Sequence, residues 1–309
     1  MRTWARWIVF PAMLIAVVGG SLVLLQRGVS GEMLLPPVLL ATIAAVALLE
    51  RALPHRPAWN HSRGDLAADA AYLPMTISIN AVIEPGARIL AAASGAWLAA
   101  HLGGGLWPSH GALLGQLVLA CLIAEFFDYF AHRFMHENAW LWRFHAVHHS
   151  SERLYWLNAT RAHPGEILFR GMVGVVPLAL LGAPRDVFLL LGVVNVVVGF
   201  FQHANIDFEL GPLSWIFSVG EMHRWHHSRR REEADSNYGN NFLVWDAVFG
   251  TRHRPRDRQP PSEIGIEGLE LPRHLLGQLA APFRMARRDV HGMNPSSERS
   301  ARSRWSRPL

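Results

Sequence analysis

The chain has 309 residues, of which half are hydrophobic and only 17% are charged, against about 25% in an average soluble protein. All 29 basic side chains are arginine, and a net charge of +5 is too small to indicate a nucleic-acid-binding protein. A single cysteine, Cys121, excludes a disulfide scaffold and a cysteine-rich zinc site. The composition instead favours a membrane protein.

Charge divides the chain into an apolar part and a polar part. Residues 1–203 contain 13 Arg and 11 acidic residues, whereas the remaining 106 residues contain 16 Arg and 13 acidic residues. This asymmetry predicts that the first two-thirds lies in the bilayer and the last third in water. The tail from about Asn294 is rich in Ser, Arg and Pro, and we predict that it is disordered.

The first two uncharged runs, residues 8–26 and 33–49, are long enough to cross a bilayer, which takes about 20 apolar residues. Arg2 and Arg6 precede the first run, as in a signal peptide, but no small-residue cleavage site follows it. We therefore interpret this run as an uncleaved membrane anchor.

The next apolar stretch, residues 70–102, contains Pro74, Pro85 and Arg88. Because it is too long for one straight span and proline disrupts a helix interior, we expect a broken helix, for example a surface segment that leads into a span. Residues 112–131 form the following predicted span.

Residues 167–203 are predicted to form a helical hairpin. They are apolar apart from Arg170 and a turn that begins Gly-Ala-Pro at 182–184. Each arm has about 15 residues, so a hairpin that enters the membrane and two full spans both remain open. The predicted fold is all-α: a polytopic membrane bundle of about four spans plus the hairpin, with a histidine-rich cap.

Arginines predict the orientation of this bundle. Arg51, Arg56 and Arg63 follow the second span, whereas Arg27 alone lies in the first loop. The positive-inside rule therefore places the N-terminus and the polar third in the cytoplasm. We expect an integral protein of a bacterial inner membrane, with N-terminal membrane helices at 1–110, a catalytic domain at 111–252 and a cytoplasmic segment at 253–309.

Histidines form three short motifs: HRFMH at 132–136, HAVHH at 145–149 and HRWHH at 223–227. A helix places residues three and four apart on one face, so each motif directs two or three imidazoles to one point. Eight imidazoles exceed the four ligands of a structural zinc and predict two metal ions, although imidazole alone does not identify the metal. The predicted ligands are His132, His136, His145, His148, His149, His223, His226 and His227.

Two carboxylates share a helical stripe with the first histidine pair. Glu125 and Asp128 lie at membrane depth, where carboxylates are costly and face the protein interior. They are predicted either to fix imidazole tautomers or to bind metal directly. Alternatively, they form buried ion pairs with Arg133 or Arg161.

Two further histidines are candidate ligands. His203 ends the second hairpin arm at the boundary where the first pair lies, which favours ligation over a capping role. His163 precedes Pro164, so a turn is expected there, and either metal binding or a contact with a neighbouring carboxylate is open.

In this order, the histidine motifs and the hairpin resemble the fatty acid hydroxylase or sterol desaturase superfamily. The resemblance covers about residues 112–252 and includes GPLSWIF at 211–217 and NYGNNFLVWDAVFGT at 237–251, which look most like the branch containing alkylglycerol monooxygenase and bacterial sterol-desaturase-like proteins. It implies a membrane di-iron oxygenase that uses O2 to hydroxylate or desaturate a lipid. The eight motif histidines match the family's iron ligands, and His203 matches an additional histidine.

The resemblance leaves the substrate open among sterol-like lipids, fatty acyl chains, ether lipids and carotenoids. The sequence has no GxGxxG nucleotide-binding motif, so we expect a separate redox protein to supply electrons. Two other classes are weighed against the oxygenase: a metal-dependent membrane hydrolase, which needs fewer histidines, and a non-catalytic lipid-binding membrane protein.

Overall fold

The computed structural model describes residues 2–102, 106–255 and 257–285. Within these ranges the regular structure is helical, with isolated bridges but no strands, so the predicted all-α fold is confirmed. The tail that was predicted to be disordered from about Asn294 lies outside the described residues.

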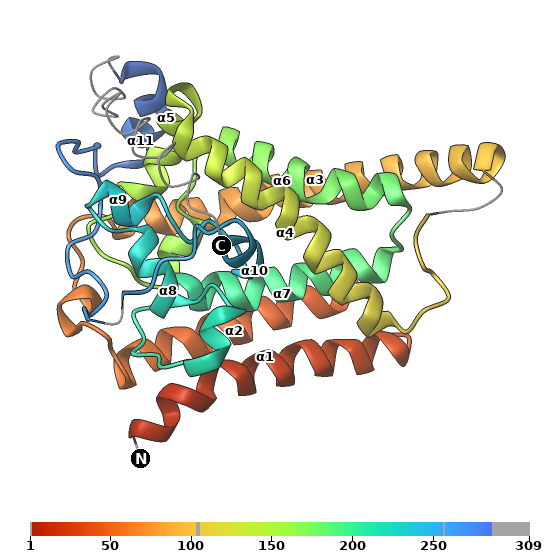
Figure 1. Cartoon of the computed structure of the whole chain (residues 1–309), viewed down its shortest axis with the longest axis horizontal. Coiled ribbons are helices and arrows are strands. Elements are labelled where there is room, and N and C mark those ends of the chain that lie inside the picture. The colour runs from red at the N-terminus through yellow and green to blue at the C-terminus, as the bar shows by residue number, and fades with distance from the viewer. Residues whose placement is uncertain (1, 103–105, 256, 286–309) are drawn as a thin grey trace.

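Six long helices form one bundle (Figure 1). Each contains at least 18 residues that are apolar enough to cross a membrane, which agrees with the predicted polytopic architecture. These helices are α1 (Arg2–Gln26), α2 (Gly31–Ala52), α3 (Leu66–Leu102), α4 (Leu113–Glu137), α6 (Pro164–Leu181) and α7 (Arg185–His203).

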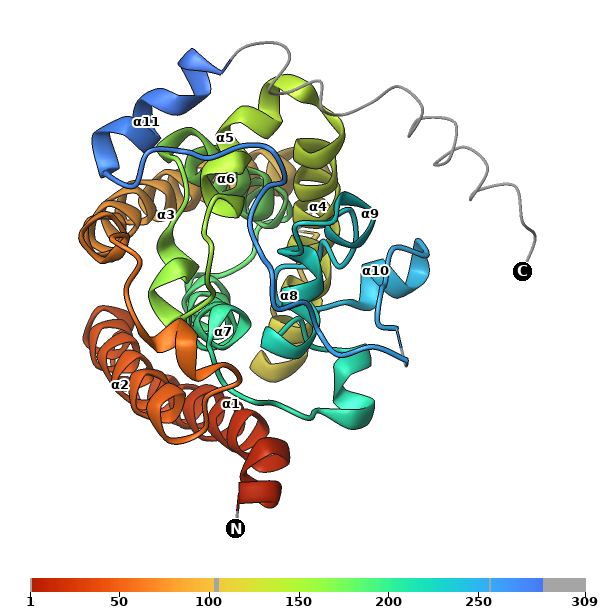
Figure 2. The ribbon, with the colours of Figure 1, turned by 90° about the vertical axis from the view of Figure 1, so that its left-hand side faces the viewer.

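Helix α7 lies at the centre of the bundle, and its neighbours surround it (Figure 2). In the most apolar stretch of α7, 72% of the residues are buried, whereas only 11% are buried in the corresponding stretch of α1. The outer helices expose large apolar side chains such as Ile15, Leu48 and Val82. Exposed apolar surface of this extent suits contact with lipid rather than water.

The predicted hairpin is formed by α6 and α7. Gly182 ends α6 in the left-handed conformation with φ of 83°, and Pro184 caps the start of α7. The two arms have 18 and 19 residues, longer than expected, because α6 begins at Pro164. By length and composition both arms are candidates for full spans.

Helix α3 corrects the expectation of a broken segment. It is continuous over 37 residues despite Pro74 and Pro85, and it packs along α6. Gly171 permits this close approach, since a Cβ there would lie 2.8 Å from Ile83 Cδ1. Further along, Ser94 Oγ donates to the carbonyl of Ala179 at 2.9 Å. These two contacts hold α3 against α6 on both sides of Pro85.

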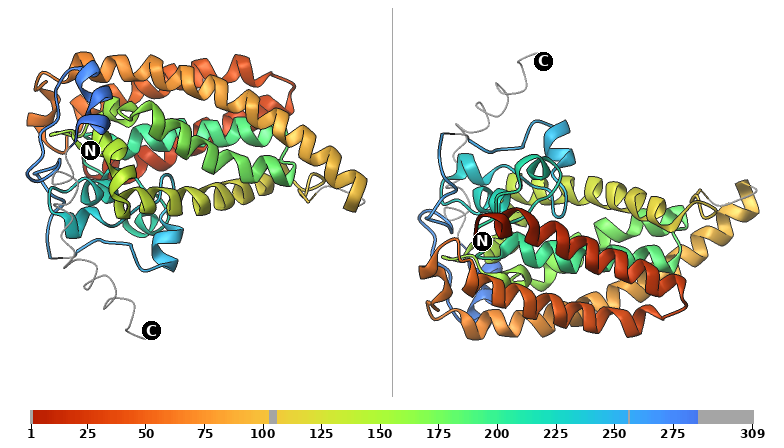
Figure 3. Two further views of the ribbon diagram at one scale, coloured as in Figure 1. Left: turned by 90° about the horizontal axis from the view of Figure 1, so that it is seen from above. Right: turned by 90° about the horizontal axis from the view of Figure 1, so that it is seen from below.

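The short helices gather at one end of the bundle, next to the N-terminal end of α1 (Figure 3). They form a cap that is joined to the membrane helices by short loops. Its elements are η1 (Pro57–Asn60), α5 (Ala139–His149), η2 (Trp156–Thr160), η3 (Gly211–Trp215), α8 (Gly220–His226), α9 (Arg231–Ala234), α10 (Val244–Val248) and α11 (Leu275–Arg284).

Buried ion pairs fix the loop between α5 and α6 to the start of α3. Arg153 donates to both carboxylate oxygens of Asp65, at 2.7 and 2.9 Å. Arg161 pairs with Asp69, which also accepts a hydrogen bond from the Tyr155 hydroxyl at 2.7 Å. This two-point attachment positions the chain that follows the second histidine motif.

Candidate metal centre

Nine buried histidines meet in two clusters where the cap joins the bundle. In each cluster the candidate ligand atoms all lie within 4.8 Å of one another. The structure therefore brings together all eight histidines of the three motifs, and it adds His203 to them. The five-histidine cluster contains His132, His136, His145, His149 and His226, and the four-histidine cluster contains His148, His203, His223 and His227.

Both HxxHH motifs contribute to both clusters. The outer pair of α5, His145 and His149, lies in the five-histidine cluster, while His148 lies in the other. In the third motif, at the end of α8, the division is reversed, because His223 and His227 lie in the four-histidine cluster and His226 does not. Residues four apart share a helix face, and the residue between them is rotated away from it.

A sharp turn between α4 and α5 makes this convergence possible. Asn138 ends α4 and caps α5, since its side chain accepts hydrogen bonds from the backbone N–H groups of Trp140 and Leu141 at 3.0 and 3.1 Å. The cap lets α5 begin with only one residue between it and α4, so that the first two motifs face each other.

Backbone carbonyls fix the orientation of several imidazoles. A carbonyl can only accept a hydrogen bond, so each bonded Nδ1 carries the proton and Nε2 keeps its lone pair. The three shortest such bonds run from His132 Nδ1 to Tyr238 O at 2.6 Å, from His226 Nδ1 to Ser236 O at 2.8 Å and from His148 Nδ1 to Arg161 O at 2.9 Å.

The inward nitrogens are arranged as metal ligands would be. Nε2 atoms of neighbouring histidines approach to between 2.9 and 3.2 Å in both clusters. Ligands about 2.1 Å from a metal and at right angles to each other are separated by about 3.0 Å. His132 and His145 both donate outward through Nδ1, so their facing Nε2 atoms have only lone pairs, which a cation would satisfy.

Burial favours the neutral imidazoles that metal binding requires. It lowers the pKa values of His149 and His227, and the surrounding imidazoles lower them further. The Nε2 atom of His136 is buried and has no hydrogen-bond partner. A buried polar atom without a partner is rare, and a bound cation would account for it.

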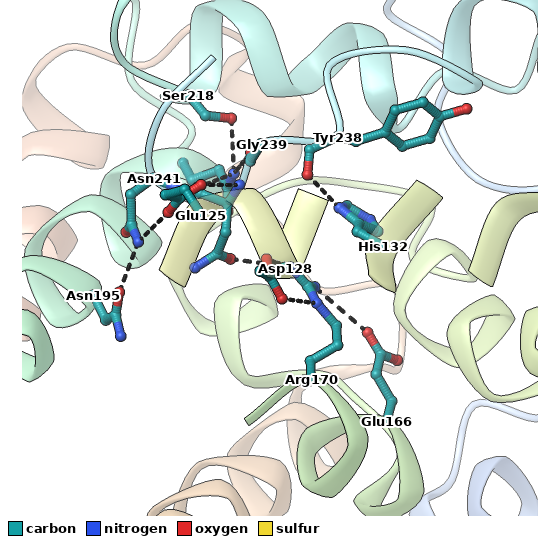
Figure 4. A network of polar contacts seen from close by, with 12 residues as sticks. Glu125, Asp128, His132, Glu166, Arg170, Asn195, Ser218, Tyr238, Gly239 and Asn241 are labelled. Atoms are coloured by element: carbon teal, nitrogen blue, oxygen red, sulfur yellow. Dashed lines mark hydrogen bonds and ion pairs between the residues drawn. The ribbon is translucent and has the colours of Figure 1, made fainter. Parts of the chain in front are cut away.

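Asp128 and Glu125 do not contact the histidines, which corrects their predicted role (Figure 4). Asp128 pairs with Arg170 through two hydrogen bonds of 2.9 and 2.6 Å, rather than with Arg133 or Arg161. Glu125 accepts hydrogen bonds from the backbone N–H and the side chain of Asn241, at 2.7 and 2.6 Å. Partners from other segments, Arg170 of α6 and Asn241 of the loop at 237–251, therefore bind the two carboxylates.

Two other carboxylates contact imidazoles, and the sequence analysis missed both. Glu166 Oε1 accepts a hydrogen bond of 2.7 Å from His145 Nδ1, and Asp235 Oδ1 accepts one of 3.1 Å from His136 Nδ1. Carboxylates in this position orient a metal-bound imidazole and raise its basicity. Glu166 also lies 3.8 Å from Arg170, so the pair formed with Asp128 adjoins this contact.

His163 lies outside both clusters and caps α6. Its Nδ1 accepts a hydrogen bond of 3.0 Å from the Gly165 N–H, while its ring packs edge-on against Phe144. The contact with a neighbouring carboxylate that we considered is absent from the contacts described for this side chain, whose Nε2 faces the Leu279 carbonyl at 3.2 Å.

The stretch at 237–251 forms a loop that supports the clusters. Asn237 adopts φ of 51°, and its amide donates to the Met222 carbonyl at 3.1 Å. Asp246 accepts from the N–H groups of Tyr238 and Gly239, both at 2.8 Å. A Cβ on Gly239 would lie 2.0 Å from a backbone oxygen, so only glycine fits there. The loop thereby holds the Tyr238 carbonyl against the first motif.

The chain is similar in sequence to several known proteins. The chain is 41% identical over 262 residues to ornithine lipid hydroxylase OlsE of Rhizobium tropici, covering 84% of this chain and 78% of that protein. It is 38% identical over 154 residues to alkylglycerol monooxygenase of Danio rerio, covering 50% of this chain and 33% of that protein. It is 31% identical over 147 residues to methylsterol monooxygenase 2-2 of Arabidopsis thaliana, covering 47% of this chain and 54% of that protein.

No solved structure matches the chain. The fatty acid hydroxylase family model matches residues 117–251, which contain all nine clustered histidines. Together with the extensive match to the bacterial hydroxylase, this shows that the chain belongs to the fatty acid hydroxylase family.

Proposed function

We propose that this protein is an O2-dependent di-iron oxidoreductase that hydroxylates a membrane lipid. The observation that carries the proposal is the convergence of nine buried imidazoles at one end of an apolar bundle. The names of the three relatives, two monooxygenases and a lipid hydroxylase, favour hydroxylation over desaturation. The proposed ligands are His132, His136, His145, His149 and His226 for one ion, and His148, His203, His223 and His227 for the other.

The two clusters fit a pair of iron ions in number and in donor type, because imidazole binds iron readily. When bound, the irons would supply oxidation of an unactivated C–H bond by O2. The protein holds the ligands ready: carbonyls of Tyr238, Arg161 and Ser236 fix three imidazoles, and burial excludes bulk water from all nine. Glu166 and Asp235 place negative charge behind two neutral ligands.

Hydroxylation also requires an electron source. One oxygen atom of O2 enters the C–H bond and the other leaves as water, which consumes two electrons and two protons. We propose that a separate redox protein delivers the electrons to the cap, and that the cap faces the cytoplasm of a bacterial cell. The segment from the end of α2 to the start of α3, which contains Arg51, Arg56 and Arg63, supports this orientation because it lies at the cap end (Figure 1). The loop between α1 and α2, which contains Arg27, lies at the opposite end.

The substrate is proposed to be a lipid whose reacting carbon reaches the membrane boundary. The clusters lie at the ends of α4 and α7, so a lipid in the leaflet next to the cap has the shortest approach. An ornithine-containing lipid is the first substrate to test, given the bacterial relative. We assign the chemistry to residues 111–252 and membrane attachment mainly to residues 1–110.

The test combines three measurements on protein purified with its iron. Metal analysis is expected to give about two irons per chain, and added bacterial lipid is expected to stimulate O2 uptake in the presence of a reductant. Mass spectrometry of lipids from cells with and without the gene is expected to show a gain of one oxygen atom. Zinc without O2 uptake would instead indicate the hydrolase, and an unchanged lipid profile would contradict the lipid substrate.

A further inference from the structure

A second site lies on the far side of α8 from the histidine clusters. A cleft of about 610 Å³ is bordered by the start of α1, the loop at 207–209, α8 and residues 254–255 and 258–260. Glu221, Arg224 and Trp225 of α8 line it, whereas the histidines of this helix belong to the clusters. Its volume is in the range of small-molecule sites, about 300–1,000 Å³.

Cationic side chains outnumber carboxylates around the cleft. Two of its arginines are paired within it, because Arg6 contacts Asp207 at 3.1 Å and Arg254 contacts Glu221. Arg258 is paired with Glu233, which does not line the cleft, at 2.7 Å, so that Arg224 is the lining arginine left without an ion pair among the described residues. The lining arginines are Arg6, Arg224, Arg254 and Arg258, and the lining carboxylates are Asp207, Glu209 and Glu221.

Arg224 is a buried cation without a carboxylate partner among the described residues. Its side chain is only 1% exposed, yet no carboxylate of the described residues lies within 4.0 Å of it. It donates to the carbonyls of Ala204 and Ile206, at 3.1 and 2.5 Å, and its Nε has no partner. A buried charge without a counter-ion is costly, so an anion in the cleft would stabilise it.

His55 lies in the positive environment that these arginines create. This histidine lines the cleft, and its buried Nε2 has no hydrogen-bond partner. Burial and the charges of Arg224, Arg56 and Arg6 lower its pKa to about 2, so the ring is neutral. The cleft thus offers several N–H donors and a positive potential to the oxygens of an anionic group.

The position of the cleft indicates where the anion comes from. Arg6 lies in the first turns of α1, next to Trp4 and Trp7, and Trp4 is 75% exposed. Trp215, also exposed, follows the loop at 207–209. Exposed tryptophans at the end of a span mark the headgroup level of a bilayer. We propose that this cleft binds the phosphate or carboxylate of a membrane-lipid headgroup.

The test measures binding to the full-length, iron-loaded protein in an uncharged detergent, by native mass spectrometry. Three probes separate the sources of the anion: dihexanoyl phosphatidic acid, dihexanoylglycerol and inorganic phosphate. Phosphatidic acid is expected to bind at least about tenfold more tightly than either of the others, because it alone combines charge-assisted hydrogen bonds with an acyl anchor. If dihexanoylglycerol bound as tightly as phosphatidic acid, anion recognition would be refuted. If inorganic phosphate bound as tightly as phosphatidic acid, the lipid source of the anion would be refuted.

Variants locate the site. Arg224→Gln and Arg258→Gln are each expected to weaken binding of phosphatidic acid about tenfold, the size of one charged hydrogen bond. Arg230→Gln is the matched control, since its side chain is 70% exposed on the same end of the molecule and does not line the cleft. If Arg224→Gln fails to fold, Arg258→Gln decides alone. Unchanged affinity in the folded cleft variants would refute the site, independently of the iron chemistry.

Discussion

His148 and His149 are consecutive in the sequence but belong to different histidine clusters. Their ring centroids are 5.6 Å apart and their planes are inclined by 82°. Successive residues of a helix differ in direction by about 100°, so one helix lying between two metal sites supplies ligands to both. The two proposed irons are therefore held by shared helices rather than by separate domains.

This arrangement predicts that each of the two histidines controls a different metal ion. His148→Ala removes one of four ligands from the four-histidine cluster, and His149→Ala removes one of five from the other. Each variant is expected to retain about one iron per chain and to lose lipid oxidation, because the chemistry requires both ions. Metal analysis and iron spectroscopy should distinguish the ion that remains. The exposed His61, changed to alanine, is the control and should keep both metals.

Glu166 is predicted to tune metal affinity through His145. Glu166→Gln keeps an acceptor for the Nδ1 proton but removes the negative charge, so iron should be lost to a chelator about 10- to 100-fold more readily. Glu125→Gln provides the comparison. It disturbs hydrogen bonds to Asn241 and is expected to lower thermal stability with little change in chelator resistance. Equal chelator resistance in the two variants would exclude a role of Glu166 at the metal.

These two carboxylates also show what the sequence can and cannot predict. The eight motif histidines follow from spacing, because residues three and four apart converge on any helix. Glu125 and Asp128 share the stripe, but a stripe does not reveal that Asn241 and Arg170, from other segments, bind these carboxylates. Glu166 and its imidazole are 21 residues apart, and only the return of α6 beside α5 brings them together. Periodicity carries no information on such contacts.

The overall fold was predictable from the sequence, but one of its helices was not. The number of long apolar runs predicted the helix bundle, since bilayer thickness sets helix length. Continuity of α3 through Pro74 and Pro85 was not predictable, because it depends on packing against α6, where Gly171 and Ala179 meet it. The two prolines locally favour a break in the helix, but packing against α6 keeps α3 continuous.

The pair of Asp65 and Arg153 predicts an acid-sensitive attachment of the cap. Burial opposes ionisation of Asp65, but Arg153 outweighs it and lowers the pKa from 3.8 to about 2. A carboxyl with a lowered native pKa stabilises the fold above its unfolded pKa, and this contribution disappears as the pH falls from about 4 to 2. At pH 7, Asp65→Asn is therefore expected to be about 2 kcal/mol less stable than the wild type.

Because a protonated Asp65 resembles asparagine, the stability difference should shrink to near zero by about pH 2, and acid effects common to both proteins cancel. Thermal unfolding in detergent at a series of pH values measures it. A difference that stays constant between pH 4 and pH 2 would contradict the assigned ion pair. Glu152→Gln, at an exposed carboxylate 3.6 Å from Arg63, is the control and should change stability little at any pH.

The last prediction concerns the side of the membrane on which the cap lies. Cys121 is buried and is the only cysteine of the chain, so a Cys121→Ala background permits labelling at chosen positions. Arg27, in the loop between α1 and α2, and Arg63, just before α3, are both exposed, and these two segments lie at opposite ends of the bundle (Figure 1). If the cap is cytoplasmic, as the arginine distribution indicates, an impermeant thiol reagent added to spheroplasts should label Arg27→Cys and should label Arg63→Cys only after lysis. The reverse pattern would place the histidine clusters outside the cytoplasm and remove their access to cytoplasmic electron donors.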